Sequence, residues 1–233
     1  MAAFTYKKIC SLVDEVFATS AKLNILDFGC GNGELLEYFP QSRIKKYLGV
    51  DINDESIKKA KLKNKAKNVS FKIIDRKNDM FGIRNSMDVI ISIGVLQYMS
   101  DQEITNFLKM AKEMLKKRGI LIISCATDHF IYRMFNLYGI FLPNRFVNRN
   151  WLVMLLKKIG FTVDYQKETG LLLAPLFSHN IVFFFDAMDK ILFKTKGELG
   201  VVGLFVRKLA YPLLWLEASL PVDFGYNLTL RSS

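Results

Sequence analysis

The segment ILDFGCGNGELL, residues 25–36, carries the pattern that decides the fold. A short apolar run ends at Asp27, glycine recurs at every second position (Gly29, Gly31 and Gly33), and a helical pattern follows. Glycine allows a ligand to approach the backbone closely and tolerates positive φ angles. The segment therefore predicts a strand, a tight ligand-binding turn and the start of a helix.

Further apolar runs follow along the chain. The expected strands cover residues 24–28, 46–50, 69–74, 88–93 and 120–125, and helical stretches separate most of them. Nearly continuous apolar runs are typical of strands that are buried on both faces. Strands that alternate with helices favour an α/β fold, with a parallel sheet covered by helices on both sides.

The clearest helix is expected over residues 101–117, where apolar side chains form one stripe. Ser100 followed by Glu103 predicts a capping box at its start, and Gly119 is expected to stop it. Further expected elements are helices over residues 4–18 and 151–159, the second ended by Gly160, and strands over residues 161–167 and 226–230.

Composition excludes several classes of protein. The 233 residues are 51% hydrophobic, 24% charged and 13% aromatic, which suits a folded domain and excludes a largely disordered chain. The three cysteines have no CxxC spacing, and no His/Cys/Asp/Glu cluster has metal-ligand spacing, so we expect no metal. Three cysteines do not make a disulfide framework, so we expect a reducing, cytoplasmic setting. The sequence shows no signal-peptide pattern and no uninterrupted membrane-spanning run.

The net charge of +11 lies within residues 1–167, because residues 168–233 hold six basic and six acidic side chains. A run of six lysines extends from Lys58 to Lys67. This run could steer anions or face an acidic membrane, and the alternative is a solvated helix face. Because no aromatic residues interleave with the lysines, we expect no nucleic-acid partner.

The ends of the first two expected strands favour a nucleoside ligand without a phosphate cradle. A dinucleotide fingerprint requires glycine five residues after Gly29, where this chain has Glu34, and an acid there disfavours a pyrophosphate. Asp51 ends the second strand and can accept both hydroxyl protons of a ribose. Ile52 could cover a purine, and the alternative is that Asp51 only caps the following helix.

Four segments in order, DFGCGNG, VDIN, IIDR and DVIISIGVLQYMSDQE, resemble class I S-adenosylmethionine-dependent methyltransferases. The likeness is to the small-molecule group that includes ubiquinone and menaquinone biosynthesis methyltransferases, and it covers residues 22–168. It implies a Rossmann-like three-layer sandwich with a seven-stranded, mostly parallel sheet and an antiparallel last strand. The implied layout is one domain, with an N-terminal helix (1–20), a cofactor-binding core (22–168), an apolar helical insertion (169–222) and the last strand (223–233).

The resemblance implies S-adenosyl-L-methionine as cofactor and S-adenosyl-L-homocysteine as product. Asp51 would hold the ribose, and Ile52 would lie against the adenine. The residues implied at the methionine end are Asp27, Gly29, Cys30, Gly31 and Gly33, with backbone from Ser92 and Ile93. Asp75 and Arg76 would lie at the adenine edge.

A sulfonium is already a strong methyl donor, so positioning can supply most of the catalysis. If the acceptor must lose a proton, the candidate bases are His129 and Tyr98, which follow two strand ends. The alternatives are that His129 only starts a helix and that Tyr98 only packs.

Residues 130–143 and 170–220 are rich in aromatic and aliphatic side chains. We expect them to cover a small apolar or amphiphilic acceptor, such as a lipid, a quinone or polyketide-like ring, or a lipid-linked intermediate. Two alternatives for these segments are peripheral membrane contact and an ordinary helical lid. Two alternative functions are a non-catalytic protein that binds S-adenosylmethionine or a partner, and an NAD-dependent oxidoreductase.

Overall fold

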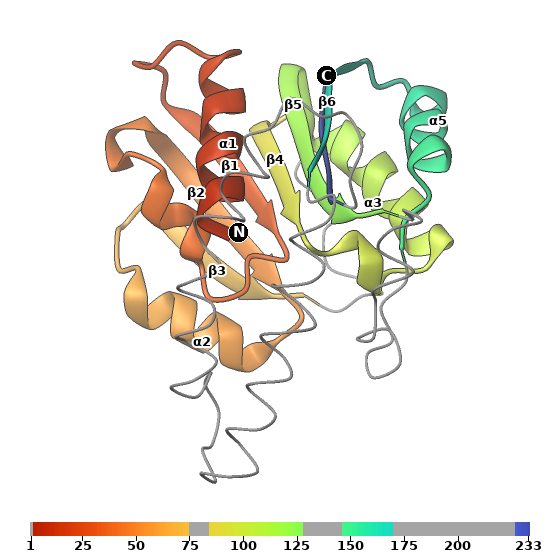
Figure 1. Ribbon diagram of the computed structural model, residues 1–233. Helices are drawn as coiled ribbons and strands as arrows, with labels where there is room; N and C mark the ends of the chain where they lie inside the picture. Colours follow the sequence, from red (N-terminus) through yellow and green to blue (C-terminus); the bar gives the residue numbers. More distant parts are fainter. Residues whose placement is uncertain (1, 75–83, 128–145, 170–226) are drawn as a thin grey trace, which may run out of the picture. The chain divides into compact units, whose positions relative to one another are not determined.

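The computed structural model describes residues 2–74, 84–127, 146–169 and 227–233 (Figure 1). The chain divides into two compact units. The first consists of Ala2–Cys125, Val147–Gln166 and Thr229–Ser233 and holds nearly all of the described residues. The second consists of Ala126–Phe146 and Lys167–Leu228 together with Met1. The expected insertion at 169–222 lies outside the described residues, except for Thr169.

A single sheet of seven strands runs in the order β3-β2-β1-β4-β5-β7-β6, which confirms the expected α/β class. Its strands are β1 (Leu23–Phe28), β2 (Ile44–Asp51), β3 (Val69–Ile73), β4 (Met87–Ile93), β5 (Leu115–Ala126), β6 (Val163–Thr169) and β7 (Asn227–Ser232). β1 pairs in parallel with β2 and β4, and two further parallel pairs are β2 with β3 and β4 with β5. The carboxyl ends of these five strands therefore share one edge of the sheet.

The last strand runs against its neighbour. Thr162, just before β6, and Ser233, just after β7, exchange both backbone hydrogen bonds, at 2.9 and 3.0 Å. Two residues that exchange both bonds form an antiparallel pair. The start of β6 thus meets the end of β7, as the resemblance implied.

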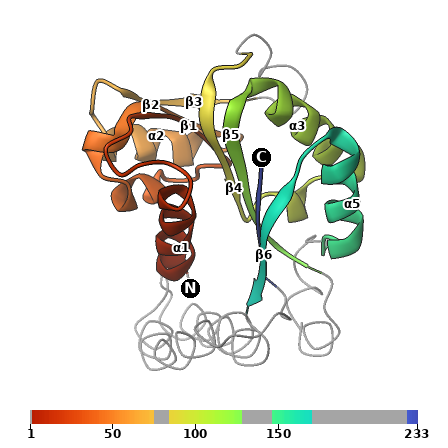
Figure 2. The same cartoon turned by 90° about the horizontal axis from the view of Figure 1, so that it is seen from above.

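Helices cover both faces of the sheet (Figure 2). One face packs under α1 (Ala2–Asp14), η1 (Glu34–Tyr38) and α2 (Asp54–Lys63), which share an apolar core with inward residues of β1, β2, β4 and β5. The other face packs under α3 (Asp101–Met114), whose Phe107 ring lies 4.4 Å from the ring of Phe28, and α3 contacts α5 (Arg149–Ile159). Within the described residues, no helix combines the length and apolar character that crossing a membrane requires.

The helix predicted over residues 101–117 begins as expected, but the prediction that it stops at Gly119 was wrong. The capping box of Ser100 and Glu103 is present, but α3 ends at Met114 and Leu115 is already extended, with ψ 140°. Gly119 lies inside β5, where an added β-carbon would lie 2.9 Å from the carbonyl oxygen of Met87. Gly119 is needed because the backbone of β4 approaches it closely. The sequence pattern does not distinguish such a glycine from one that stops a helix.

The helix expected after the glycine turn is a single short 3₁₀ segment, η1. Pro40 explains its end, because proline lacks an N–H group and drives the preceding residue to an extended conformation. Phe39 has φ −93° and ψ 125°. At α5 the prediction was confirmed, since Gly160 ends the helix in the left-handed region with φ 97°.

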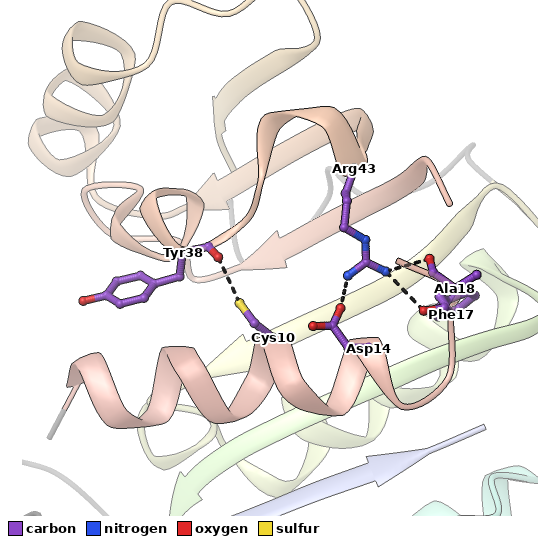
Figure 3. A network of polar contacts seen from close by, with 6 residues as sticks. All are labelled: Cys10, Asp14, Phe17, Ala18, Tyr38 and Arg43. Atoms are coloured by element: carbon purple, nitrogen blue, oxygen red, sulfur yellow. Dashed lines mark hydrogen bonds and ion pairs between the residues drawn. The ribbon is translucent and has the colours of Figure 1, made fainter. Parts of the chain in front are cut away.

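A polar network holds α1 against the short 3₁₀ segments (Figure 3). The buried guanidinium group of Arg43, in η2 (Gln41–Arg43), donates to the Asp14 carboxylate and to the carbonyl oxygens of Phe17 and Ala18, the last two at 3.3 and 3.2 Å. The thiol of Cys10 donates to a carbonyl oxygen of η1 at 3.5 Å. Arg43 therefore ties the last residue of α1 and the turn that follows the helix to η2.

Candidate cofactor site

The glycine turn follows β1, and all three glycines have positive φ: 79° at Gly29, 51° at Gly31 and 76° at Gly33. The turn folds back on the end of β2, because the N–H groups of Gly29 and Cys30 both donate to the Val50 carbonyl oxygen, at 2.7 and 3.0 Å. A side chain at Gly29 would meet Val95, with an added β-carbon 2.1 Å from its Cγ2. The turn is therefore held between the carboxyl ends of β2 and β4.

Asp51 is half-buried at the end of β2 and is bound to the turn. Its Oδ2 accepts from the N–H of Gly31 at 2.8 Å, and its Oδ1 accepts from the N–H of Asn53 at 2.9 Å. The cap of α2 is instead Asn53, whose side chain accepts from the N–H of Ser56 at 3.0 Å. The alternative role of Asp51 as the helix cap was therefore wrong.

The arrangement leaves Asp51 able to bind a ribose. A carboxylate oxygen has two lone-pair sites, so each oxygen keeps one site beyond its backbone bond. Ile52, the next residue, is 53% exposed. An exposed aliphatic side chain beside this carboxylate suits the stacking face of a purine.

Asp27 lies deeper, 2% exposed, and accepts a 2.5 Å hydrogen bond from the Tyr47 hydroxyl group. Burial raises the pKa of Asp27 to about 7, because it disfavours the charged form. The Tyr47 hydrogen bond opposes that rise, and the negative charge of Asp51 adds to it. This carboxyl group is thus partly protonated near neutral pH.

Cys30 is buried in the same turn. Burial first, and then the charges of Asp27 and Asp51, raise the pKa of its thiol well above the usual value. The thiol therefore stays protonated, and a protonated thiol is a poor nucleophile.

Acidic and phenolic groups also surround the turn on the α1 side. Glu34, the first residue of η1, accepts a 3.2 Å hydrogen bond from the hydroxyl of Tyr6 on α1. Burial, followed by the charge of Glu34, raises the pKa of Tyr6. The charged group that acts on the pKa of Asp27 is another acid, Asp51. These surroundings fit a cationic nucleoside and disfavour a pyrophosphate.

Ser92 and Ile93 end β4, where the resemblance places backbone near the methionine. Ser92 is fully buried and pairs in register with Phe28. The chain then turns at Gly94, which has φ 67° and whose N–H donates to the Ser124 carbonyl oxygen at 2.8 Å. Tyr98, in η3 (Leu96–Tyr98), is 50% exposed.

Three predicted site residues, Asp75, Arg76 and His129, lie outside the described residues. In the part of the chain that the structure describes, no group of three or more His, Cys, Asp or Glu side chains could hold a metal ion.

Two residues that sequence reasoning missed are Tyr47 and Val95. A tyrosine inside a buried strand is itself a signal, because its hydroxyl group requires a partner.

Comparison with known proteins identifies the family of the chain. Residues 1–166 match a family described as a methyltransferase domain. The Bacillus cereus malonyl-(acyl-carrier protein) O-methyltransferase is 30% identical over 120 residues, which are 50% of this chain and 42% of that protein. The chain thus spans less than half the length of that relative.

Solved structures share the fold. An S-adenosylmethionine-dependent methyltransferase from Mesorhizobium loti has a TM-score of 0.62 at 14% identity, over 95% of each chain. A 4+2 cyclase has a TM-score of 0.62 at 14% identity, over 97% of this chain and 79% of its own.

The chain belongs to the methyltransferase-domain family, because the match covers more than half of its length. Its fold is the Rossmann-like fold that the resemblance implied, and a solved S-adenosylmethionine-dependent methyltransferase shares that fold.

Proposed function

We propose that this protein transfers a methyl group from S-adenosyl-L-methionine to a small apolar or amphiphilic acceptor. The observation that carries the donor half is the bond from the Gly31 N–H to the Asp51 carboxylate. It joins the glycine turn to a ribose-binding acid in surroundings whose neighbouring charges are negative.

Each side chain would have a distinct task. Asp51 holds the ribose hydroxyl groups and Ile52 covers the adenine, while the turn from Gly29 to Gly33 admits the backbone of the ligand closely. Asp27 lies nearest the methionine end. When bound, the cofactor supplies an electrophilic methyl group, and the protein contributes alignment of the acceptor with that group.

The acceptor half rests on different support. The Bacillus cereus relative is named for a malonyl group on an acyl-carrier protein, which is an acyl thioester and not a nucleic acid. Residues 130–143 and 170–220 are rich in apolar side chains, and they lie outside the described part of the chain. The acceptor class therefore remains a lipid, a quinone or polyketide-like ring, or a lipid-linked intermediate.

On the acceptor side we propose Tyr98 and His129. Tyr98 follows β4 and is half exposed, so it is free to contact an acceptor. Tyr98→Phe and His129→Ala separate two roles. Loss of the acidic limb of the pH–rate profile, in which the rate rises with pH, indicates a general base, whereas an increase in KM alone indicates acceptor binding.

The test is transfer of an isotope-labelled methyl group across a panel of fatty acyl, quinone and polyketide-like acceptors, with Asp51→Asn as the control whose transfer should be impaired at low donor concentration. Thermal stabilisation by S-adenosylhomocysteine and not by NAD supports the donor. Stabilisation without transfer to any acceptor would favour a non-catalytic role.

Membrane contact is a separate proposal for the apolar segments and for the lysine run from Lys58 to Lys67. Flotation with liposomes that contain or lack anionic lipid tests it, and failure to float with either composition would contradict it. Methyl transfer to a soluble acceptor does not depend on that result.

A further inference from the structure

Tyr47 and Asp27 form a buried pair beneath the glycine turn. The hydroxyl group of Tyr47, on β2, donates to Oδ2 of Asp27, on β1, at 2.5 Å, and the two residues are 1% and 2% exposed. Among the described residues, this hydroxyl is the side-chain donor to Asp27. Tyr47 therefore fixes the position of that carboxyl group.

The groups that face the pair leave its charge uncompensated. The negative charge of Asp51 on β2 raises the pKa of Asp27, and Cys30 lies in the turn. The charges of Asp27 and Glu34 raise the pKa of Tyr6 on α1. None of these groups is a cation. Burial with a like charge nearby favours the neutral carboxyl group, and a single hydroxyl donor opposes this only in part.

We propose that Asp27 holds a proton in the free protein and releases it when the ammonium end of the methyl donor binds, with Tyr47 as the positioning residue that keeps its hydrogen bond to the resulting carboxylate. The O–H bond of the Asp27 carboxyl group breaks, the proton passes to the buffer, and the new negative charge faces the ligand's ammonium group. This inference rests on the donor half of the proposed function.

The structure favours this over a purely structural pair. A tyrosine hydroxyl group buried in a core needs a partner, and a backbone carbonyl would satisfy it without placing an acid there. Here the partner is the second-last residue of the strand that leads into the glycine turn, two residues before Gly29. The cost of ionising Asp27 in the free protein becomes part of the binding equilibrium, so donor affinity should depend on pH.

The test is calorimetric titration of the full chain with S-adenosylhomocysteine, which keeps the ammonium group, in two buffers of different ionisation enthalpy. With a free-protein pKa of about 7, binding at pH 6 should release about 0.9 proton, and at pH 8 about 0.1. The affinity should rise about tenfold between these pH values.

Two variants and one control separate the alternatives. Asp27→Asn cannot release a proton, so its heat of binding should not depend on the buffer. Tyr47→Phe removes the bond that favours the carboxylate, so release should persist at pH 8 and the affinity there should fall about tenfold for each unit of increase in the Asp27 pKa. Tyr38→Phe, on the neighbouring η1, should match the wild type.

Three results would overturn the proposal. These are binding at pH 6 with no proton released, equal release in the wild type and Asp27→Asn, and an unchanged pH profile in Tyr47→Phe. The first of these would leave the proposed function intact. Absence of any binding by the wild type would remove the proposed donor as well.

Discussion

The side chain of Val95 fills the space that a β-carbon on Gly29 would need. An ideal β-carbon there would lie 2.1 Å from Cγ2 of Val95, and Gly29 has a φ of 79°. The strand end of β1 and the residue after the Gly94 turn therefore pack directly on each other. The absence of a side chain at Gly29 leaves room for Val95 beside the turn that follows β1.

Replacing Gly29 with alanine should therefore damage the site more than the same change at Gly31. Gly31 also has a positive φ, but an added β-carbon there meets no atom within 4 Å. The left-handed conformation alone costs alanine about 1–2 kcal/mol, and overpacking adds about 1–3 kcal/mol. We expect Gly31→Ala to lose about 1 kcal/mol and Gly29→Ala about 3 kcal/mol, measured by urea denaturation.

Val95→Ala provides the matched test of this packing. In the background of Gly29→Ala it should recover the overpacking part of the loss and leave the conformational part. Equal losses for the two glycine substitutions, or no recovery by Val95→Ala, would show that the contact is unimportant.

Much of the fold was predictable because its signals are local. The apolar runs of β1 and β4 are buried on both faces and lie within one residue of their predicted ends. The capping box at Ser100 and the left-handed stop at Gly160 depend on short-range chemistry, and both were confirmed. The wrong end of α3 came from Gly119, whose role depends on a distant backbone atom in the sheet.

The candidate site was predictable in part. Asp51 and the glycines were identified from their order and spacing, and the structure places them in contact. The partners that control them were missed, because Tyr47 and Val95 act through tertiary contacts that no spacing rule contains. The sequence places Asp27 next to the turn but says nothing about its burial, which determines its charge.

Asp51→Asn should weaken S-adenosylhomocysteine binding by about 10- to 100-fold. The change removes a charged acceptor, and hydrogen bonds to charged groups contribute about 1.5–3 kcal/mol. It also weakens the bond from the Gly31 N–H, at 2.8 Å. Asp54→Asn is the control, because Asp54 pairs with Lys58 on the exposed side of α2. Calorimetry that gave equal affinities for the two variants would contradict the ribose role.

Arg43→Met should loosen α1 and leave the sheet intact. The substitution keeps the aliphatic stem and removes the bonds to the Asp14 carboxylate and to the carbonyl oxygens of Phe17 and Ala18. We expect faster amide hydrogen exchange in α1 and a stability loss of about 1–3 kcal/mol, with exchange in β4 changed only by the global loss.

Asp14→Asn should have a smaller effect, because its side chain is partly exposed and the carbonyl oxygens still accept from Arg43. Uniform acceleration of exchange across the described elements would indicate that the network supports the whole fold and not α1 in particular.

Asp27→Asn should stabilise the protein, and the gain should grow with pH. The pKa of Asp27 is raised to about 7 in the folded state, against 3.8 for an ordinary aspartate, so between these values the folded state holds a proton that the unfolded chain has lost. Stability then falls as pH rises from about 4 to about 7 and becomes constant above that range. The full difference corresponds to roughly 4 kcal/mol at 1.36 kcal/mol per pKa unit. Asparagine has no charged form and can still accept from the Tyr47 hydroxyl group. Urea denaturation of both proteins at pH 5 and pH 8 should therefore show a larger stability difference at pH 8, and a difference that is constant with pH would mean that Asp27 is already ionised in the folded protein.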